Sequence, residues 1–126
     1  MFEDTKAFSG FSVNDIARAK AFYGDTLGLR VSEENGMLLL HLAGDTTVLV
    51  YPKDDHAPAS FTILNFPVPD VAAAVDALTA RGVDFERYPA FAEGTDDKGV
   101  VRDPRGPTIA WFKDPAGNVL SVLEPM

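Results

Sequence analysis

A repeated motif constrains the fold of this chain more than any other feature of its 126 residues. Phe11-x-Val13-x-Asp15 recurs 55 residues later as Phe66-x-Val68-x-Asp70, and Ile16 after the first copy corresponds to Val71 after the second. A single module of this size would leave one face of its sheet uncovered, so two similar modules are expected to pack together. The repeat therefore predicts one domain over residues 1–126 with a pseudo-twofold arrangement.

The first module, residues 1–52, reads as β-α-β-β-β. Asn14-Asp15 offers a helix cap, hydrophobic residues follow at helical spacing, and Gly28 ends the helix. Asn35-Gly36 is a strong signal for a hairpin turn. The strands of this module are predicted at Lys6–Val13, Leu29–Ser32, Met37–Leu42 and Thr46–Tyr51.

The second module, residues 61–126, repeats that order after a polar connection at residues 53–60. Pro69-Asp70 starts its helix, and Val71, Val75 and Leu78 form the hydrophobic stripe of that helix. The chain as a whole is therefore predicted to have an α+β fold. The strands of the second module are predicted at Phe61–Val68, Val83–Tyr88, Thr108–Lys113 and Asn118–Glu124.

The last two strands are expected to form a hairpin around Asp114-Pro115-Ala116-Gly117, because proline presets its own φ and glycine tolerates a positive φ. Symmetric pairing about this turn places Trp111 opposite Ser121, and directly opposed side chains share one face of a sheet. Trp111 is the only tryptophan of the chain. The face that carries Trp111 and Ser121 is therefore the predicted ligand-binding face.

Composition excludes several classes of function. The absence of cysteine rules out disulfides, thiolate metal ligands and a cysteine nucleophile. A net charge of −8 argues against nucleic-acid binding, which needs a basic face, and is compatible with a cationic small ligand. The first residues lack the pattern of a targeting signal and no segment has the length of a membrane span, so a cytoplasmic protein without a membrane partner is expected.

A long stretch rich in turn-forming residues precedes the final hairpin. Connections of this length inside a compact domain are often binding loops, so Gly94–Gly106 is either a lid or a plain surface loop. Arg102 and Arg105 in this stretch either clamp a ligand carboxylate or pair with nearby aspartates. The sequence leaves both alternatives open.

In its motifs the chain resembles the vicinal oxygen chelate superfamily, which includes glyoxalase I, extradiol dioxygenases and the fosfomycin- and bleomycin-resistance proteins. The resemblance implies two β-α-β-β-β modules whose eight strands form a cupped mixed sheet, with the helices outside and a ligand inside. It also implies a homodimer. The motifs that carry it are Phe11-x-Val13-x-Asp15, Ala21-Phe22-Tyr23, Leu27-Gly28-Leu29 and Phe112-Lys113-Asp114-Pro115-Ala116-Gly117-Asn118.

The metalloenzymes of that superfamily hold a divalent metal with four side chains from strands of the cup. The resemblance places Phe8 and Ile63 at two histidine positions and Ser121 at a glutamate position. The fourth ligand comes from the strand at 46–51, which here offers neither histidine nor carboxylate. Such sites need imidazole or carboxylate ligands, so these four positions predict that the chain binds no metal. No other cofactor is expected.

The same resemblance gives the cup an apolar lining with a few polar groups, which is typical of pockets for small organic molecules. Trp111 either stacks on an aromatic or cationic ligand or fills space as an ordinary core residue. The predicted ligand-binding residues are Phe8, Ser12, Val50, Ile63, Asn65, Trp111 and Ser121, together with Arg102 and Arg105 of the long stretch.

Three classes of function are compatible with this sequence. The leading hypothesis is a metal-free protein of the glyoxalase and bleomycin-resistance type that binds a small hydrophobic or aromatic molecule. The second is an enzyme, either a lyase or dioxygenase with rearranged metal ligands or a metal-free acid–base catalyst that uses His41 or Glu124. The third is a regulatory or interaction module whose cup is filled by its own side chains. If the two histidines bind no metal and take no part in catalysis, His41 is a hydrogen-bonded strand residue and His56 is a solvated loop residue.

Overall fold

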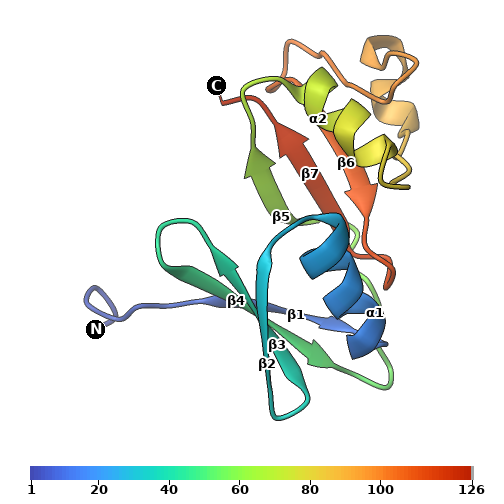
Figure 1. Ribbon diagram of the computed structural model, residues 1–126. Coiled ribbons are helices and arrows are strands. Elements are labelled where there is room, and N and C mark those ends of the chain that lie inside the picture. The colour runs from blue at the N-terminus through green and yellow to red at the C-terminus, as the bar shows by residue number, and fades with distance from the viewer. Residues whose placement is uncertain (126) are drawn as a thin grey trace. The chain divides into compact units, whose positions relative to one another are not determined.

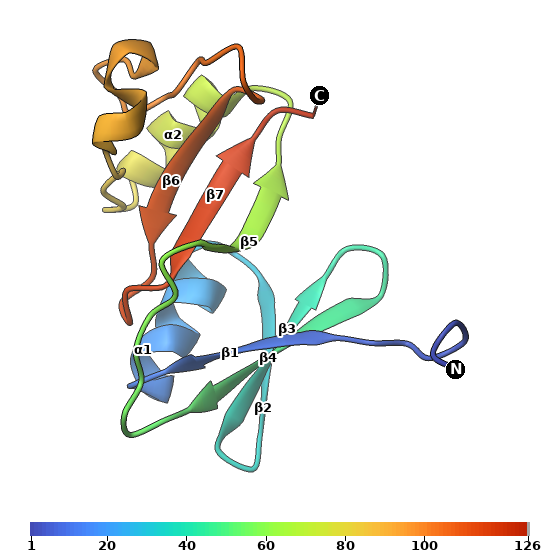
Figure 2. The same ribbon diagram turned by 180° about the vertical axis from the view of Figure 1, so that it is seen from behind.

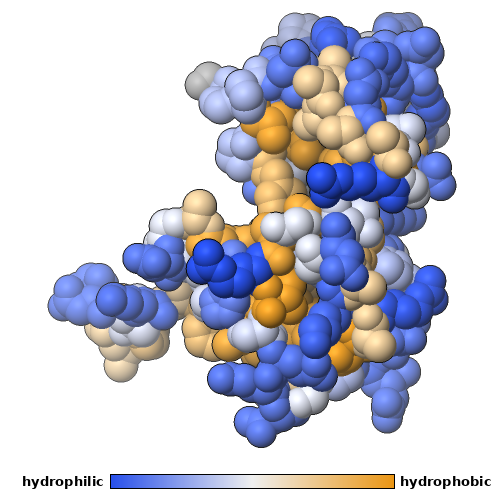
Figure 3. Space-filling model, in the orientation of Figure 1, coloured by the Kyte–Doolittle hydropathy of each residue, from blue (hydrophilic) through white to orange (hydrophobic). Residues whose placement is uncertain are grey.

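The computed structural model describes residues 1–125, which form two compact units, Met1–Ala57 and a second that begins at Pro58. The boundary lies inside the connection predicted at residues 53–60. Each unit consists of one sheet with an α-helix on one of its faces (Figure 1). Hydrophilic residues predominate on the surface that Figure 3 shows, in keeping with the net charge of −8. No helix within residues 1–125 is both long and apolar enough to cross a membrane.

The first unit contains β1 (Ser9–Val13), β2 (Arg30–Glu34), β3 (Met37–Leu42) and β4 (Thr46–Pro52). They form a mixed sheet in the order β1-β4-β3-β2, with β1 parallel to β4 and the other pairs antiparallel. The helix between β1 and β2 starts as α1 (Ile16–Lys20) and continues as the π-helix η1 (Ala21–Thr26). It begins after Asp15, whose side chain accepts a hydrogen bond from the Arg18 N–H at 3.0 Å.

Alternation along the strands gives the sheet of the first unit one buried and one open face. Ala19 and Tyr23 of the helix are buried with the hydrophobic residues of one face, and the Phe11 and Tyr23 rings lie 5.7 Å apart. The opposite face is partly exposed and carries several polar side chains. The fully buried strand residues are Val13, Leu38, Leu40 and Val50, and the polar residues of the open face include Ser12, Ser32 and His41.

The second unit contains β5 (Thr62–Pro67), β6 (Ile109–Lys113) and β7 (Val119–Leu123) in the order β5-β7-β6. β5 is parallel and β6 antiparallel to the central β7. The helix α2 (Val71–Thr79) starts after Asp70, whose side chain accepts a hydrogen bond from the Ala73 N–H at 3.1 Å. α2 covers one face of this sheet and buries Val71 and Val75 there (Figure 1).

The prediction of a strand at Val83–Tyr88 is wrong. Only Phe85 forms a bridge, to Phe112, and the Glu86 N–H donates to the Trp111 carbonyl at 2.7 Å. Pro89 then begins the 3₁₀ helix η2 (Pro89–Gly94), because proline has no N–H with which to continue a ladder. The described residues therefore contain seven strands in two sheets, and not the eight strands that were predicted.

The terminal hairpin has the predicted register, with Trp111 opposite Ser121. Its turn is held by the buried carboxylate of Asp114, which accepts hydrogen bonds at 2.9 Å from the N–H groups of both Ala116 and Asn118. The Asn118 side-chain amide also donates to this carboxylate, at 3.0 Å. Gly117 takes a φ of 86°, which glycine adopts without strain.

Replacing Asp114 by alanine is expected to lower the free energy of unfolding by about 2–3 kcal/mol, because several donors lose a charged, buried acceptor. Urea unfolding followed by far-UV circular dichroism measures the change. Asp54→Ala is the matched control, since Asp54 is an exposed aspartate in the connection between the units. Equal stability of the two variants would contradict the role assigned to the Asp114 carboxylate.

Candidate functional site

Trp111 lies in the middle of β6, on the sheet face opposite to α2. Its ring N–H donates to Thr62 Oγ1 on β5 at 3.1 Å. Because β7 lies between β6 and β5, the indole reaches across β7 at the position of Ser121. Trp111 is thus held between strands and remains partly exposed.

A β-bulge in β5 decides which side chains meet Trp111. Thr62 is in register with Val119 and Leu64 with Leu120, which leaves one extra residue, Ile63, in β5. Without the bulge, strict alternation would place Ile63 and Asn65 on one face. With the bulge, Thr62 takes the position beside Trp111 that the sequence assigned to Ile63.

Ser121 is fully buried although it lies on the same face as Trp111. Its hydroxyl donates to Asn65 Oδ1 at 2.5 Å, and Asn65 is the residue in register with it on β5. Asn65 itself is exposed. The structure therefore brings three predicted residues, Asn65, Ser121 and Trp111, into one row across the sheet.

Two further aromatic rings surround Trp111. The Tyr88 ring meets it edge to face with centroids 5.5 Å apart, and the Phe91 ring lies 5.3 Å away at an interplanar angle of 34°. Such contacts stabilise a fixed orientation of the rings. Burial, followed by the charge of Glu86, raises the pKa of the Tyr88 phenol, which therefore stays neutral at physiological pH.

A pocket of about 260 Å³ opens beside Trp111. Its walls are mostly hydrophobic, and the charged groups in them come from one ion pair at the rim. The pocket is formed entirely by the second unit, between β6 and the segment that contains η2, which lies along β6 (Figure 2). The lining residues are Phe91, Val101, Asp103, Arg105, Gly106, Pro107, Ile109 and Trp111.

The segment at Gly94–Gly106, predicted as either a lid or a plain loop, is anchored as a wall of this pocket. Val101 forms bridges with both Thr95 and Ile109. The Arg102 N–H donates to the Gly94 carbonyl at 2.9 Å, and Arg102 Nη1 donates to an oxygen of the Asp96 carboxylate, also at 2.9 Å.

The Asp96 carboxylate organises the turn inside that segment. It accepts hydrogen bonds at 2.9 Å from the Lys98 and Val100 N–H groups in addition to Arg102. Burial raises the pKa of Asp96, but the hydrogen bonds from Val100, Arg102 and Lys98 together lower it below its ordinary value. The charge of Arg102 is therefore already engaged within the segment.

Arg105 is engaged in the same way by Asp103. Its Nε donates to Asp103 Oδ1 at 2.8 Å and its Nη2 to Oδ2 at 2.7 Å, a bidentate pair. The side-chain hydrogen bond from Arg105, with that from the Arg105 N–H, lowers the pKa of Asp103 to about 2. The Arg105 guanidinium also lies over the Phe91 ring, 5.2 Å from its centroid.

In the first unit, two predicted residues make serine–histidine pairs. Ser12 Oγ shares a hydrogen bond of 2.6 Å with His56 Nδ1, and Ser32 Oγ one of 2.8 Å with His41 Nε2. His56 is thus a partly buried loop residue that is tied to β1. Phe8 lies just before β1 and is 66% exposed.

Two other predicted residues serve the core or a helix end. Val50 is fully buried on the helix-covered face of its sheet, among the hydrophobic residues of the core, and its role as a ligand contact stays a prediction. Glu124 accepts a hydrogen bond from the Val71 N–H at 3.0 Å, at the start of α2. An acidic side chain is stabilising there, because the first N–H groups of a helix have no partner within the helix.

The positions that correspond to the superfamily's metal ligands do not fit a divalent cation. Phe8 and Ile63 carry hydrocarbon side chains without a donor atom, and the Ser121 hydroxyl is buried against Asn65. Among residues 1–125, no three histidine or carboxylate side chains gather closely enough to hold a metal ion.

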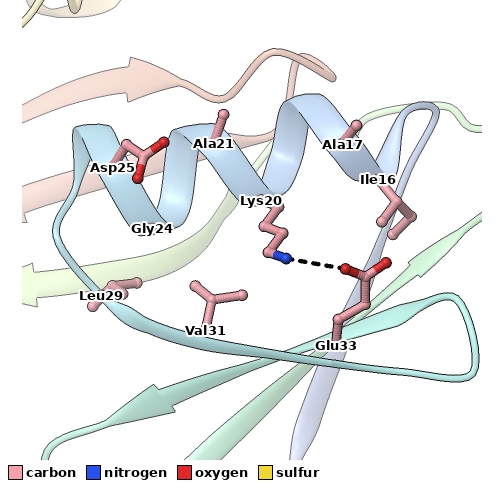
Figure 4. Close-up of a pocket in the computed structure, with 9 residues that line it drawn as sticks. All are labelled: Ile16, Ala17, Lys20, Ala21, Gly24, Asp25, Leu29, Val31 and Glu33. Carbon is pink, nitrogen blue, oxygen red and sulfur yellow. Dashed lines mark hydrogen bonds and ion pairs between the residues drawn. The ribbon is translucent and has the colours of Figure 1, made fainter.

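A second and larger hollow, of about 670 Å³, lies in the first unit between its helix and β2 (Figure 4). Val31 points toward the helix, and Lys20 Nζ reaches across to Glu33 Oε2 at 3.2 Å. About half of each of these two charged side chains is exposed. The hollow has no aromatic wall and is crossed by a solvent-exposed ion pair, so it offers a ligand less than the pocket beside Trp111.

Several pocket residues could not be identified directly from the sequence. Tyr88 and Phe91 flank Pro89 in a stretch that was interpreted as a strand followed by a loop, so their rings were not linked to Trp111. The one available signal was two aromatic residues close together in a segment otherwise rich in turn formers. The bulge that places Thr62 beside Trp111 is seen in the register of β5 with β7, and the types of residue in β5 do not indicate it.

Comparison with family models matches residues 9–122 to the family described as the Glyoxalase/Bleomycin resistance protein/Dioxygenase superfamily. A comparison with curated protein sequences finds no significant match.

Solved structures with the same fold cover nearly the whole chain. TnmS3, an antibiotic-binding protein from Streptomyces sp. CB03234, is 26% identical with a TM-score of 0.68, covering 98% of each chain. A superfamily member from Sphaerobacter thermophilus is 23% identical with a TM-score of 0.69, covering 94% of this chain and 97% of its own. The fosfomycin resistance protein FosX from Listeria monocytogenes is 12% identical with a TM-score of 0.71, covering 95% of this chain and 92% of its own.

Two glycine substitutions test whether the segment beside β6 is a fixed wall. A Cβ at position 94 would lie 2.6 Å from the Arg102 carbonyl oxygen, so Gly94→Ala is expected to cost about 1–3 kcal/mol of stability. Gly106→Ala is the matched control, because its Cβ meets no atom within 4 Å. Thermal unfolding followed by Trp111 fluorescence measures both. Equal stability of the two variants would show that the segment adapts freely.

Proposed function

This chain belongs to the Glyoxalase/Bleomycin resistance protein/Dioxygenase superfamily, and from that premise we propose that it binds a small hydrophobic or aromatic molecule without a divalent metal. The observation that carries the proposal is the pocket beside Trp111 in the second unit. It combines hydrophobic walls with a small number of oriented polar groups, which is how sites for small organic ligands are built.

The pocket is preformed in a way that favours binding. Trp111 is held by the hydrogen bond to Thr62 and by the Tyr88 and Phe91 rings, and the opposite wall is anchored through Val101. A ligand therefore orders few side chains when it binds. Since each immobilised side chain costs about 0.5–1.5 kcal/mol of binding free energy, a preformed pocket binds more tightly than a flexible one of equal area.

The absence of suitable metal ligands supports binding over metal-dependent chemistry. The positions of Phe8, Ile63 and Ser121 offer no imidazole or carboxylate. TnmS3, which has the same fold at 26% identity, is described as an antibiotic-binding protein. That description supports small-molecule binding as the activity of this chain. Phe8 and Ser12 of the first unit remain predicted ligand contacts.

Titration with 2-naphthol, an uncharged aromatic probe at pH 7, tests the proposal. Because Trp111 is the only tryptophan, its fluorescence reports directly on this pocket. We expect saturable quenching, and about 2- to 10-fold weaker binding after Phe91→Leu, because the ligand and Trp111 lose an aromatic neighbour.

Phe61→Leu is the matched control, since Phe61 is a phenylalanine of the same unit that is 68% exposed and does not line the pocket. Its affinity for 2-naphthol should equal that of the unaltered protein. Quenching that does not saturate, or equal weakening by both substitutions, would contradict binding in the pocket beside Trp111.

A further inference from the structure

An ion pair between Asp103 and Arg105 lies at the rim of the Trp111 pocket. Resting on the proposed function, we infer that the pocket selects uncharged aromatic molecules and rejects aromatic carboxylates, with Asp103 as the residue that determines this specificity. Without Asp103, Arg105 would be a carboxylate clamp at the mouth of a hydrophobic pocket. The pair removes that property.

The fork that Nε and Nη2 of Arg105 form is directed away from a ligand. Nε and Nη2 are bound to the two oxygens of Asp103, and Nη2 also points to the Ala90 carbonyl at 3.4 Å. A guanidinium recognises a carboxylate best through two parallel N–H groups, and here that fork already faces Asp103. What Arg105 offers to the pocket is therefore the flat guanidinium that lies over Phe91.

Electrostatics also disfavour an anionic ligand. A carboxylate that approaches Arg105 meets the negative charge of Asp103 at nearly the same distance, so attraction and repulsion nearly cancel. The low pKa of Asp103 keeps it ionised at physiological pH. The net charge of −8 adds a weak repulsion. An anion would thus lose hydration on entering the pocket and gain no ion pair in return.

The hydrophobic walls define the rest of the ligand. The Phe91 and Trp111 centroids are 5.3 Å apart, whereas a ring inserted between them needs two contact distances, about 7–8 Å in total. The ligand therefore does not enter between these rings. It lies against them in the part of the pocket that Val101, Pro107 and Ile109 also line.

A pair of naphthalene probes that differ in charge tests the inference: 2-naphthol and 2-naphthoate, each titrated at pH 7 into the full chain with Trp111 fluorescence as the readout. For the unaltered protein, 2-naphthoate is expected to bind at least about fivefold more weakly than 2-naphthol. Asp103→Asn exposes the Arg105 charge, and it should tighten 2-naphthoate binding at least about fivefold while 2-naphthol changes less than twofold.

Asp97→Asn is the matched control, because it makes the same change in net charge at an exposed aspartate that does not line the pocket. It should leave the affinity order unchanged. The double variant Asp103→Asn with Arg105→Gln should lose the gain for 2-naphthoate, since the exposed cation is then absent. Circular dichroism of each variant verifies folding.

Three outcomes separate this inference from the proposed function. Failure of 2-naphthol to bind the unaltered protein overturns both. Binding of 2-naphthol together with equally tight binding of 2-naphthoate leaves the proposed function standing and overturns the inference. An equal gain in 2-naphthoate affinity for Asp103→Asn and Asp97→Asn overturns it as well, because the effect then comes from net charge and not from Arg105.

Discussion

The buried carboxylate of Asp114 is the interaction on which the geometry of the second unit depends. By accepting hydrogen bonds from Ala116 and Asn118, it sets the turn that joins β6 to β7. A hairpin turn determines strand register, and a slip of one residue would move every side chain of β6 to the other face. The turn therefore determines that Trp111 lies over Ser121, and through Trp111 it determines where the pocket is.

Much of the fold could be predicted from local signals. Asp15 and Asp70 cap their helices, Asp114-Pro115-Ala116-Gly117 forms the turn, and the pairing of Trp111 with Ser121 is confirmed. These features depend on residues close in sequence, whose preferences are strong. The residues of Val83–Tyr88 favour a strand, and a strand was therefore predicted there. That prediction is wrong because only Phe85 pairs with a neighbouring strand.

The candidate site was less predictable, because it depends on contacts between residues distant in sequence. Trp111 was recognised as a candidate from the hairpin register, and Arg105 from its place in the long stretch before the hairpin. What Arg105 does depends on its ion pair with Asp103 and its contact with Phe91. Thr62, and not Ile63, lies beside Trp111 because of the bulge in β5. The family resemblance, in turn, identified positions where the metal ligands of related enzymes are replaced by Phe8, Ile63 and Ser121.

Intermolecular nuclear Overhauser effects between 2-naphthol and the ¹³C-labelled chain test the central claim most directly. The account predicts contacts from the naphthalene protons to the methyl groups of Val101 and Ile109 and to the Trp111 ring. Contacts confined to Leu29 and Val31, in the hollow between β2 and the helix of the first unit, would contradict it. They would place ligand binding in the hollow that the ion pair of Lys20 and Glu33 crosses.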